Sequence, residues 1–528
     1  MTSRTARAIA GLVAVVIALG GCSTNSLAQS DSNNTSAAVA APEGFESYYT
    51  QEIEWRACEE DEIVPAMLQA PKDMKAYQCA TVTAPMNWDD PDSEPIQLGV
   101  ARHLNKQKDK APALFFNLGG PGGGAVDSIT PVVENILSGD VVQNYQIVAL
   151  DPRGVGASTP IICLSDEERD FENQREEDLS ALSTDELVAQ ADKEFAEYGD
   201  KCLQKNGEVL GYVDSDSATR DFDMMRALLG QKKFDYIGFS YGTIIGAYYA
   251  ELFPETVGRL VLDGAVDPAI NINELSSAQL EGMEKSLYNW IEQCQAEDKC
   301  PLTGDLESGK KQMIEFFEDL AEQPLPTGDP ERSVNSTLAY TAVIGSLYST
   351  ENYGLLQQAM SLAKMGDGTM LLFLADYFNS RGEDGIYTDN SSDAFTAINA
   401  LDYLPVGTPE EWEVESADLA ERFPVLGGDF GFASAGLEAW PVQSRVTRHR
   451  ITAPGTPEIL VIGTTNDPAT PYAMAQALAS DLESGVLLTV EGWNHTAYSK
   501  YADECVVKAV DGFLLDGKVP EDGTVCPG

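Results

Sequence analysis

Ser240 lies in a local sequence that can activate a serine as a nucleophile. It is the central residue of Gly238-Phe-Ser-Tyr-Gly242, which follows a short apolar run and precedes a second apolar run at helical spacing. Glycines on both sides allow the chain to turn sharply from a strand into a helix, so the serine Oγ stands exposed at the end of the strand. Because glycine and serine are common residues, an ordinary tight turn is the alternative interpretation.

Such a serine needs a base within hydrogen-bond reach and an acid that orients the base. In one large class of serine hydrolases the chain order is serine, acid, histidine, and this sequence has three histidines. His103 lies upstream of Ser240 in a strand pattern, and His449 precedes the apolar run 458–462. We therefore predict that His495, in a turn just after the last expected strand, is the general base.

The acid is expected after the strand that precedes His495. Asp467 follows the run 458–462 closely and opens the turn Asp467-Pro-Ala-Thr-Pro471. Asn466 cannot carry the charge, and Asp481 lies too far into the next helix. We predict that Asp467 orients the base, with Thr470 as a further hydrogen-bonding partner in the same turn.

Two N–H donors are expected to stabilise the negative charge that develops on a substrate carbonyl. One belongs to Tyr241, the residue after the nucleophile, and the other usually comes from a loop after an earlier strand. Gly119-Gly-Pro-Gly122 follows the apolar run 113–116, and we predict that Gly120 is the second donor. A phosphate-binding loop is excluded because the lysine of that motif is absent and Pro121 has no N–H. No cofactor is expected.

Short apolar strands separated by helical patterns predict an α/β fold with a mostly parallel central sheet. Strands are expected just before Ser240 and over residues 79–85, 96–103, 113–116, 145–150, 259–262, 458–462 and 486–490. Residues 165–199 are highly charged and predict a helical excursion on the surface, closed at its base by Cys163 and Cys202.

The pattern changes between residues 268 and 440, where amphipathic stretches replace strands. Helices are expected at 275–294, 310–322, 340–348 and 355–364, and the acidic, glycine-rich segments between them are interpreted as loops. We refer to residues 268–440 as the cap, since such an insertion can cover an active site. The core is then divided into residues 46–267 and 441–528.

The N-terminus has the features of a lipoprotein signal peptide over residues 1–21. Two arginines precede an apolar segment of twelve residues, too short to span a membrane, that leads into Leu19-Gly-Gly-Cys22. Cys22 is the expected lipidation site, and residues 22–45 form a flexible tether. An ordinary secretory signal is the alternative. The sequence thus predicts an exported protein that is anchored by lipid at the outer face of the cell membrane, or released from it, with no other membrane contact.

The remaining cysteines are even in number and suit an oxidising compartment. They are Cys58, Cys79, Cys163, Cys202, Cys294, Cys300, Cys505 and Cys526. Eight cysteines allow 105 connectivities, and sequential pairing is the simplest because each disulfide then closes a local loop. Zinc is the alternative, but no C-x-x-C is present and the histidines are scattered, so no metal site is expected.

The formal net charge is −50. Such a charge argues against a nucleic-acid partner, and it is explained most simply by solubility at a cell surface. It also favours cationic substrates such as peptides with a free amino terminus. The sequence does not indicate an oligomeric state.

Five motifs occur together in chain order. They are Gly-Gly-Pro-Gly (119–122), Asp-Pro-Arg-Gly-Val-Gly-Ala-Ser (151–158), Gly-Phe-Ser-Tyr-Gly-Thr (238–243), Asp-Pro-Ala-Thr-Pro (467–471) and Gly-Trp-Asn-His (492–495). The set resembles the proline iminopeptidase-like α/β-hydrolases over about residues 55–526. It is most similar to secreted tripeptidyl aminopeptidases and related cell-envelope serine hydrolases of actinobacteria.

The resemblance implies an α/β-hydrolase fold and cleavage of short peptides from a free amino terminus through an acyl-enzyme. Leu118 stands where many iminopeptidases have a histidine, so a short-peptide aminopeptidase is preferred to a strictly prolyl one. An envelope esterase or lipase with the same triad, and a non-catalytic binding lipoprotein, remain alternatives. A buried cap acid is expected to bind the substrate amine; Glu281, Glu284 and Glu292 are candidates on one predicted helix.

Overall fold

The computed structural model describes residues 41–528, apart from residues 66–69, 108–109, 177–178 and 180. The expected signal peptide, Cys22 and most of the tether lie outside the described residues. None of the helices in the described part of the chain combines the length and the apolarity that crossing a bilayer requires.

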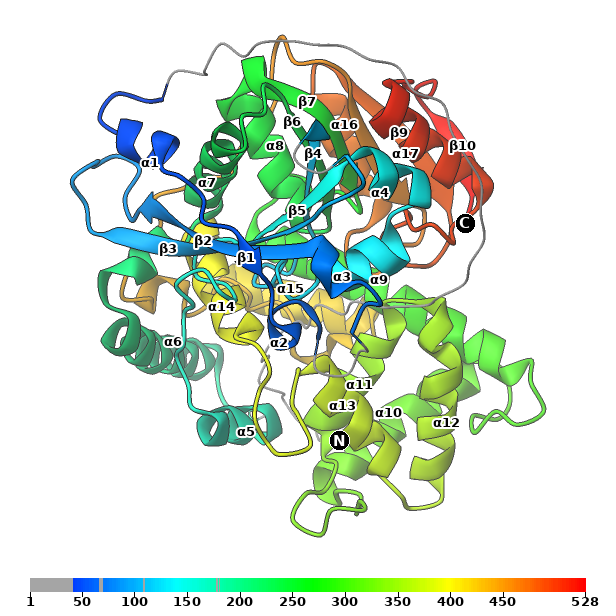
Figure 1. Cartoon of the computed structure of the whole chain (residues 1–528). Coiled ribbons are helices and arrows are strands. Elements are labelled where there is room, and N and C mark those ends of the chain that lie inside the picture. The colour runs from blue at the N-terminus through cyan, green and yellow to red at the C-terminus, as the bar shows by residue number, and fades with distance from the viewer. Residues whose placement is uncertain (1–40, 66–69, 108–109, 177–178, 180) are drawn as a thin grey trace.

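A ten-stranded sheet forms the centre of the molecule (Figure 1), in the order β1-β2-β3-β5-β4-β6-β7-β8-β9-β10. Its strands are β1 Arg56–Ala57, β2 Tyr77–Pro85, β3 Pro95–His103, β4 Ala113–Asn117, β5 Gln146–Leu150, β6 Phe234–Phe239, β7 Val257–Asp263, β8 Ile459–Thr464, β9 Gly485–Glu491 and β10 Thr524–Pro527. Pairing is antiparallel from β1 through β3 to β5 and parallel across the rest of the sheet. The predicted mostly parallel sheet is confirmed.

Helices cover both faces of the sheet because alternate residues of each strand point to opposite sides. In β4, Phe115 packs into one buried cluster and Phe116 into another. The first cluster includes residues of α1 Glu46–Thr50, α7 Ser215–Leu228, α8 Gly242–Leu252 and α16 Tyr472–Asp481. The second includes residues of α2 Glu60–Ile63, α3 Ile129–Pro131, α4 Gly139–Asn144 and α17 Glu504–Asp516.

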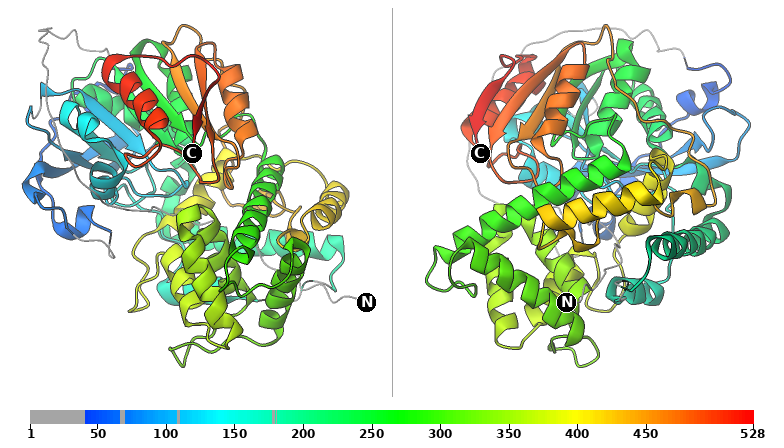
Figure 2. Two further views of the ribbon diagram at one scale, coloured as in Figure 1. Left: turned by 90° about the vertical axis from the view of Figure 1, so that its right-hand side faces the viewer. Right: turned by 180° about the vertical axis from the view of Figure 1, so that it is seen from behind.

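The chain between β7 and β8 is helical and lies below the sheet in the view of Figure 1. Its helices are α9 Ile272–Gln295, α10 Leu306–Glu322, α11 Ser336–Leu347, α12 Tyr353–Lys364, α13 Thr369–Phe378, α14 Ser391–Asp402 and α15 Pro409–Arg422. Most of them share a separate buried cluster that includes Trp290, Phe317, Leu347 and Leu374. Figure 2 shows from two further sides that this helical part lies on one side of the sheet.

The sequence analysis named no helix between residues 365 and 440, where the structure has α13, α14 and α15. In α13 the five buried residues lie on one face, but the exposed face also carries large apolar residues, Phe373 and Tyr377, so the sequence shows no polar stripe. In α14 the buried positions are mostly small residues and two aspartates, Asp393 and Asp402, which a hydrophobic pattern does not reveal.

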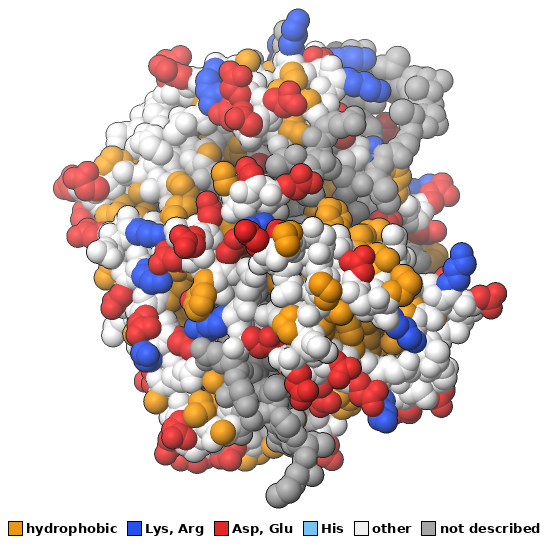
Figure 3. Space-filling view, turned by 90° about the horizontal axis from the view of Figure 1, so that it is seen from below, with side chains coloured by type: hydrophobic (Ala, Val, Ile, Leu, Met, Phe, Trp, Pro, Cys, Tyr) orange, Lys and Arg blue, Asp and Glu red, His pale blue; other side chains and the backbone are white. Residues whose placement is uncertain are grey.

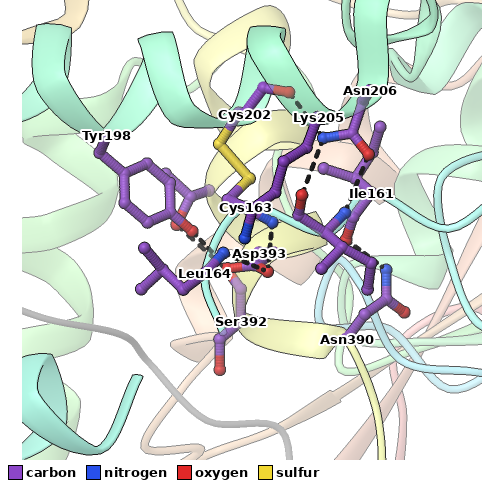
Figure 4. The surroundings of a disulfide bond; sticks show 12 residues. Ile161, Cys163, Leu164, Tyr198, Cys202, Lys205, Asn206, Asn390, Ser392 and Asp393 are labelled. Atoms are coloured by element: carbon purple, nitrogen blue, oxygen red, sulfur yellow. Dashed lines mark hydrogen bonds between the residues drawn. A yellow bond between two sulfur atoms is a disulfide. The ribbon is translucent and has the colours of Figure 1, made fainter. Parts of the chain in front are cut away.

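The excursion at residues 165–199 forms two helices, α5 Asp166–Gln174 and α6 Thr184–Asn206, which pack against the cap. Asp393 of α14 joins them: its Oδ2 accepts from the N–H of Cys163 and from Arg169 Nη2, each at 2.7 Å, and its Oδ1 accepts from Tyr198 Oη at 2.6 Å (Figure 4). The helical layer below the sheet is therefore built from two separate stretches of chain.

Four disulfides join the cysteines in sequential pairs. They are Cys58–Cys79, Cys163–Cys202, Cys294–Cys300 and Cys505–Cys526. The last holds β10 to α17. The sequence analysis did not predict β10, because a four-residue strand that ends in proline carries little pattern, so β9 and not the final strand precedes His495.

Candidate active site

Ser240 occupies the turn between β6 and α8 and has a φ of +55°. Non-glycine residues rarely adopt this conformation, and it persists where surrounding contacts hold it. The Ser240 N–H donates to the carbonyl oxygen of Asp263 at 2.9 Å, and the Ser240 carbonyl accepts from Thr243. A Cβ atom on Gly238 would lie 2.4 Å from the carbonyl oxygen of Gly242, so the flanking glycines are required for the turn.

His495 and Asp467 form a hydrogen-bonded pair with 2.8 Å between Nδ1 and Oδ1. Asp467 is buried, and its Oδ1 also accepts from the N–H groups of Ala469 and Thr470 at 2.9 and 2.8 Å. Its Oδ2 accepts from the N–H of Thr496 at 3.1 Å. These donors fix the carboxylate, which in turn orients the imidazole with Nδ1 toward the acid.

Thr470 makes a second contact with the base, as its Oγ1 lies 3.3 Å from His495 Nδ1. Both Thr470 and Asp467 belong to the turn between β8 and α16. The side chain of His495 is thus held from one short segment on its Nδ1 edge, which leaves Nε2 for the reaction.

The turn of Ser240 and the ring of His495 both lie next to the segment 263–264. Gly264 follows Asp263, to which the Ser240 N–H is bonded, and a Cβ atom on it would lie 3.5 Å from His495 Cε1. Its φ of +64° requires glycine, and a Cβ atom there would also lie only 2.9 Å from Thr496 Cγ2. Ser240, Asp467 and His495 follow β6, β8 and β9 at the carboxyl ends of these parallel strands, and their assignment as nucleophile, acid and base stays a prediction.

The glycine loop after β4 lies directly against the turn that carries Ser240. A Cβ atom on Gly119 would lie 2.9 Å from Ser240 Cβ and 3.0 Å from Tyr241 N. The N–H of Gly119 donates to Asn117 Oδ1, whereas the N–H groups of Gly120 and Tyr241 have no acceptor among the described residues. The two N–H groups chosen from the sequence are thus available to a ligand at this place.

Asp263, the last residue of β7, is a site residue that the sequence analysis did not single out. Its buried carboxylate accepts from the N–H groups of Ala497 and Tyr498 at 3.0 and 2.7 Å, while its carbonyl holds Ser240. Burial raises the pKa of Asp263 to about 6. One residue therefore anchors both the serine turn and the loop after His495.

The cap also holds the histidine loop directly. The His495 N–H donates to the carbonyl oxygen of Tyr348 at 2.8 Å, and the Tyr348 ring meets the imidazole edge-on with 5.4 Å between ring centroids. Asn494 Oδ1 accepts from both the N–H and Oγ1 of Thr350 at 2.9 Å. Because these are contacts between distant segments, no local sequence pattern marks them.

The other two histidines lie elsewhere. His103 is half-buried on β3 beside Tyr77, and burial lowers its pKa. His449 is exposed, and its Nε2 lies 2.9 Å from Glu251. Its pKa is raised chiefly by a hydrogen bond to the Thr447 backbone, and further by the neighbouring Glu251 carboxylate. Neither contacts the residues around Ser240.

The three candidate acids for the substrate amine are explained by other contacts. Glu281 is partly exposed and pairs with Lys285 and Arg422. Glu284 is buried, but its carboxylate accepts from Tyr288 Oη and from the N–H groups of Val425 and Leu426. Glu292 is exposed. The choice of these three is therefore not supported.

The described residues contain no group of three or more His, Cys, Asp or Glu side chains placed to hold a metal ion.

Known proteins resemble this chain over most of its length. A family model described as "TAP-like protein" matches residues 431–526. Serine protease Hip1 of Mycobacterium tuberculosis (strain ATCC 25618 / H37Rv) is 33% identical, over 85% of this chain and 87% of the relative. Carboxylesterase B of the same strain is 32% identical, over 89% of each chain. Tripeptidyl aminopeptidase of Streptomyces lividans is 27% identical, over 90% of this chain and 86% of the relative.

Proposed function

This chain belongs to the family of TAP-like α/β-hydrolases, and we propose that it is a serine peptidase that releases short peptides from the free amino terminus of its substrates. The observation that carries the proposal is the hydrogen-bonded His495–Asp467 pair at the same edge of the sheet as Ser240, in a chain whose relatives include a serine protease and a tripeptidyl aminopeptidase.

The proposed mechanism assigns one role to each residue. Ser240 Oγ attacks the peptide carbonyl carbon while His495 takes the serine proton on Nε2, and Asp467 stabilises the imidazolium that forms. The N–H groups of Tyr241 and Gly120 stabilise the oxyanion. His495 then protonates the leaving amine, and a water molecule, activated by the same base, hydrolyses the acyl-enzyme and restores Ser240.

The position of α14 supports a short acyl portion. A Cβ atom on Gly122, in the glycine loop, would lie 2.5 Å from the carbonyl oxygen of Ser391 in α14. The cap is thus in contact with the loop of the proposed oxyanion hole, and a long polypeptide would have to pass around it. A buried end of the substrate must place its ammonium group near a carboxylate, since desolvating an unpaired charge would prevent binding.

The test is digestion of a peptide library, read by mass spectrometry. We expect fragments that all derive from amino termini. N-acetylation of a good substrate should lower kcat/KM by at least about 10²-fold, the range for removing one partner of a buried charge pair. Equal cleavage of free and acetylated peptides would rule out the aminopeptidase activity. Ser240→Ala is the control for contaminating peptidases.

An esterase is the second candidate, favoured by the similarity to carboxylesterase B. The same triad and oxyanion hole serve both acyl transfers. Faster hydrolysis of uncharged acyl esters than of tripeptidyl arylamides would favour this alternative. Failure of a fluorophosphonate to label Ser240 would favour a binding protein without catalysis.

The cellular location is part of the proposal. The N-terminal segment with Cys22 supports export and a lipid anchor, and the four disulfides suit an oxidising compartment. Metabolic labelling with a fatty-acid analogue, compared between the natural chain and Cys22→Ala, tests the anchor. Equal labelling of both would contradict lipidation at Cys22.

A further inference from the structure

Tyr241, whose N–H is the proposed oxyanion donor, is fixed by its side chain as well as by its backbone. The side chain is buried, and its Oη lies 2.5 Å from Ser215 Oγ at the start of α7. A hydroxyl bond at the tip of a tyrosine ring restricts both the ring and the backbone that carries it. The N–H of Tyr241 therefore depends on what holds Ser215.

Ser215 is held in turn by the last residue of α14. Asp402 Oδ2 accepts from Ser215 Oγ, and Asp402 Oδ1 accepts from the Ser215 N–H at 2.9 Å. Because a carboxylate only accepts, the serine proton points to Asp402, and Ser215 Oγ accepts from Tyr241 Oη. All three residues are buried, so the chain of bonds from Tyr241 to the cap is shielded from water.

The surroundings of Asp402 keep this chain of bonds in place. Burial raises the pKa of Asp402 to about 6, and the charge of Arg448 and the bonds from Ser215 oppose that rise. The Arg448 guanidinium is fixed by stacking over the Tyr403 ring at 4.0 Å. The Asp402 carboxyl group is therefore ionised at neutral pH, and in this state it accepts both hydrogen bonds from Ser215.

The other end of α14 contacts the second proposed donor loop. A Cβ atom on Gly122 would lie 2.5 Å from the carbonyl oxygen of Ser391 and 3.0 Å from the N of Phe395. In Figure 1, α14 lies just below the strands, between the sheet and α6. The first turn of α14 thus contacts the glycine loop, and its last residue, Asp402, ends the chain of hydrogen bonds that begins at Tyr241.

We propose that α14 aligns the oxyanion hole and that Asp402 is a positioning residue, which acts on Tyr241 through the hydroxyl of Ser215. The inference rests on the proposed function, since it takes Ser240 as nucleophile and Tyr241 as donor. A displacement of about 1 Å at a reacting centre lowers rates by up to about 10²-fold, and loss of one oxyanion donor costs about 10²–10³ in kcat. A purely structural role is the alternative, because Asp402 also accepts the first N–H of α7.

The test is a double-mutant cycle between Tyr241→Phe, which removes only the hydroxyl, and Asp402→Asn. We expect each variant to lower kcat by on the order of 10-fold with KM within about twofold, because the oxyanion forms only in the transition state. The double variant should have a kcat no lower than that of the less active single variant, because both substitutions break the same chain of hydrogen bonds. The proposal would be overturned if the fold-losses in kcat of the two single variants multiplied in the double variant. It would also be overturned if either single variant kept the kcat of the natural protein.

Asp393→Asn is the matched control, as Asp393 is equally buried on the same helix but binds Cys163, Arg169 and Tyr198. In the double variant, the fold-changes in kcat caused by Asp393→Asn and by Tyr241→Phe should multiply. If Asp402→Asn does not fold, Ser215→Ala replaces it in the cycle, since it removes the middle hydroxyl and keeps the Ser215 N–H.

The rate of Ser240 labelling by a fluorophosphonate is measured on the same variants. This reagent also places an oxygen in the oxyanion hole, and it does not depend on peptide recognition. If the natural chain reacts with the reagent but cleaves no peptide, the proposed substrate is wrong, and the cycle in labelling rates still decides the role of Asp402.

Discussion

Ser240 is held by contacts that do not involve its hydroxyl. Its left-handed conformation costs on the order of 1–3 kcal/mol, which the surrounding structure must offset. The backbone bond to Asp263, the bonds from Thr243 and the close approach of Gly119 all act on the main chain. The position of the nucleophile is therefore independent of the group that reacts.

Replacing Ser240 by alanine should abolish turnover and leave the fold intact. We expect kcat to fall by at least about 10³-fold, with an unchanged midpoint of thermal unfolding. Steady-state assays and differential scanning fluorimetry on the purified variant measure the two quantities. Near-natural activity would show that another residue is the nucleophile.

His495→Ala should be as damaging as Ser240→Ala, and the double variant should be little worse, because nucleophile and base act as one unit. His103→Ala and His449→Ala are controls that should keep most of the activity, since both side chains lie away from the site. A loss in either control that matches His495→Ala would mean that the base has been misassigned.

Asp263 should act by position and not by charge. Asp263→Ala removes the acceptor for Ala497 and Tyr498, and we expect kcat to fall by on the order of 10-fold because the loop of His495 loosens. Asp263→Asn keeps an oxygen acceptor and should retain activity within about threefold. Kinetic constants of both variants at pH 7 decide the point, and equal losses would favour an electrostatic role.

The site could be predicted only where local sequence determines it. Ser240 and Asp467 follow strands in short motifs, so their places at the sheet edge could be derived from the chain alone. Asp263, Tyr348 and Asp402 act through partners that are distant in sequence, as when Asp402 bonds Ser215 across 187 residues. Their roles depend on tertiary contacts that carry no periodic signal.

Among the elements, α14 shows why the cap was predicted less well than the sheet. Its contacts extend to the glycine loop, to α5 and α6, and to α7, so polar and small residues are buried on several sides. Strands of the sheet instead bury continuous apolar runs, which are visible in sequence. A helix that contacts several other elements therefore has a weak hydrophobic pattern in its sequence.

Removal of the Cys163–Cys202 disulfide should destabilise the layer formed by α5, α6 and α14. The bond closes a separation of 39 residues, for which chain entropy gives about 4 kcal/mol, and Cys163 also donates its N–H to Asp393 (Figure 4). Chemical denaturation of the double serine variant should show a loss of this order. Cys294–Cys300, with a separation of 6, is the control and should cost about 2 kcal/mol. Equal losses would contradict the entropic argument.

At the scale of the whole molecule, acidic groups lie both on the surface and in the interior. Figure 3 shows acidic side chains spread over the face that it views from below. Among the described residues, eight buried or half-buried carboxyl groups have pKa values that are raised chiefly by burial. In four of them the pKa rises to about 7 (Asp127) or to about 6 (Asp151, Asp263 and Asp402). Between their unfolded and folded pKa values, the folded state holds more protons than the unfolded state.

Stability should therefore rise as the pH falls from 7.5 to about 5. His449, with its raised pKa, acts in the same direction, while the lowered pKa of His103 opposes it. Below this window, groups such as Glu168, whose pKa lies at about 2, lose their contribution. We expect the unfolding temperature at pH 5 to exceed that at pH 7.5 by roughly 5 °C.

Scanning calorimetry across this pH range measures the effect. Asp127→Asn should flatten the dependence, because it removes the carboxyl group with the highest folded pKa among the four. An unfolding temperature that falls steadily from pH 7.5 to pH 5 would contradict the assignment of these groups as proton-binding in the folded state.

The sequential disulfides have a consequence for biogenesis. A chain that is threaded through a membrane pore enters the oxidising side N-terminus first, and no pair here is separated by more than 39 residues. Counted after Cys22, the first, third, fifth and seventh cysteines each have the next cysteine to emerge as their native partner. Oxidation therefore needs no later exchange between wrongly paired thiols. The bond between Arg169 and Asp393, in contrast, spans 224 residues and must wait for α14. Under the proposed export, two of the four disulfides can therefore form before most of the cap has crossed the membrane.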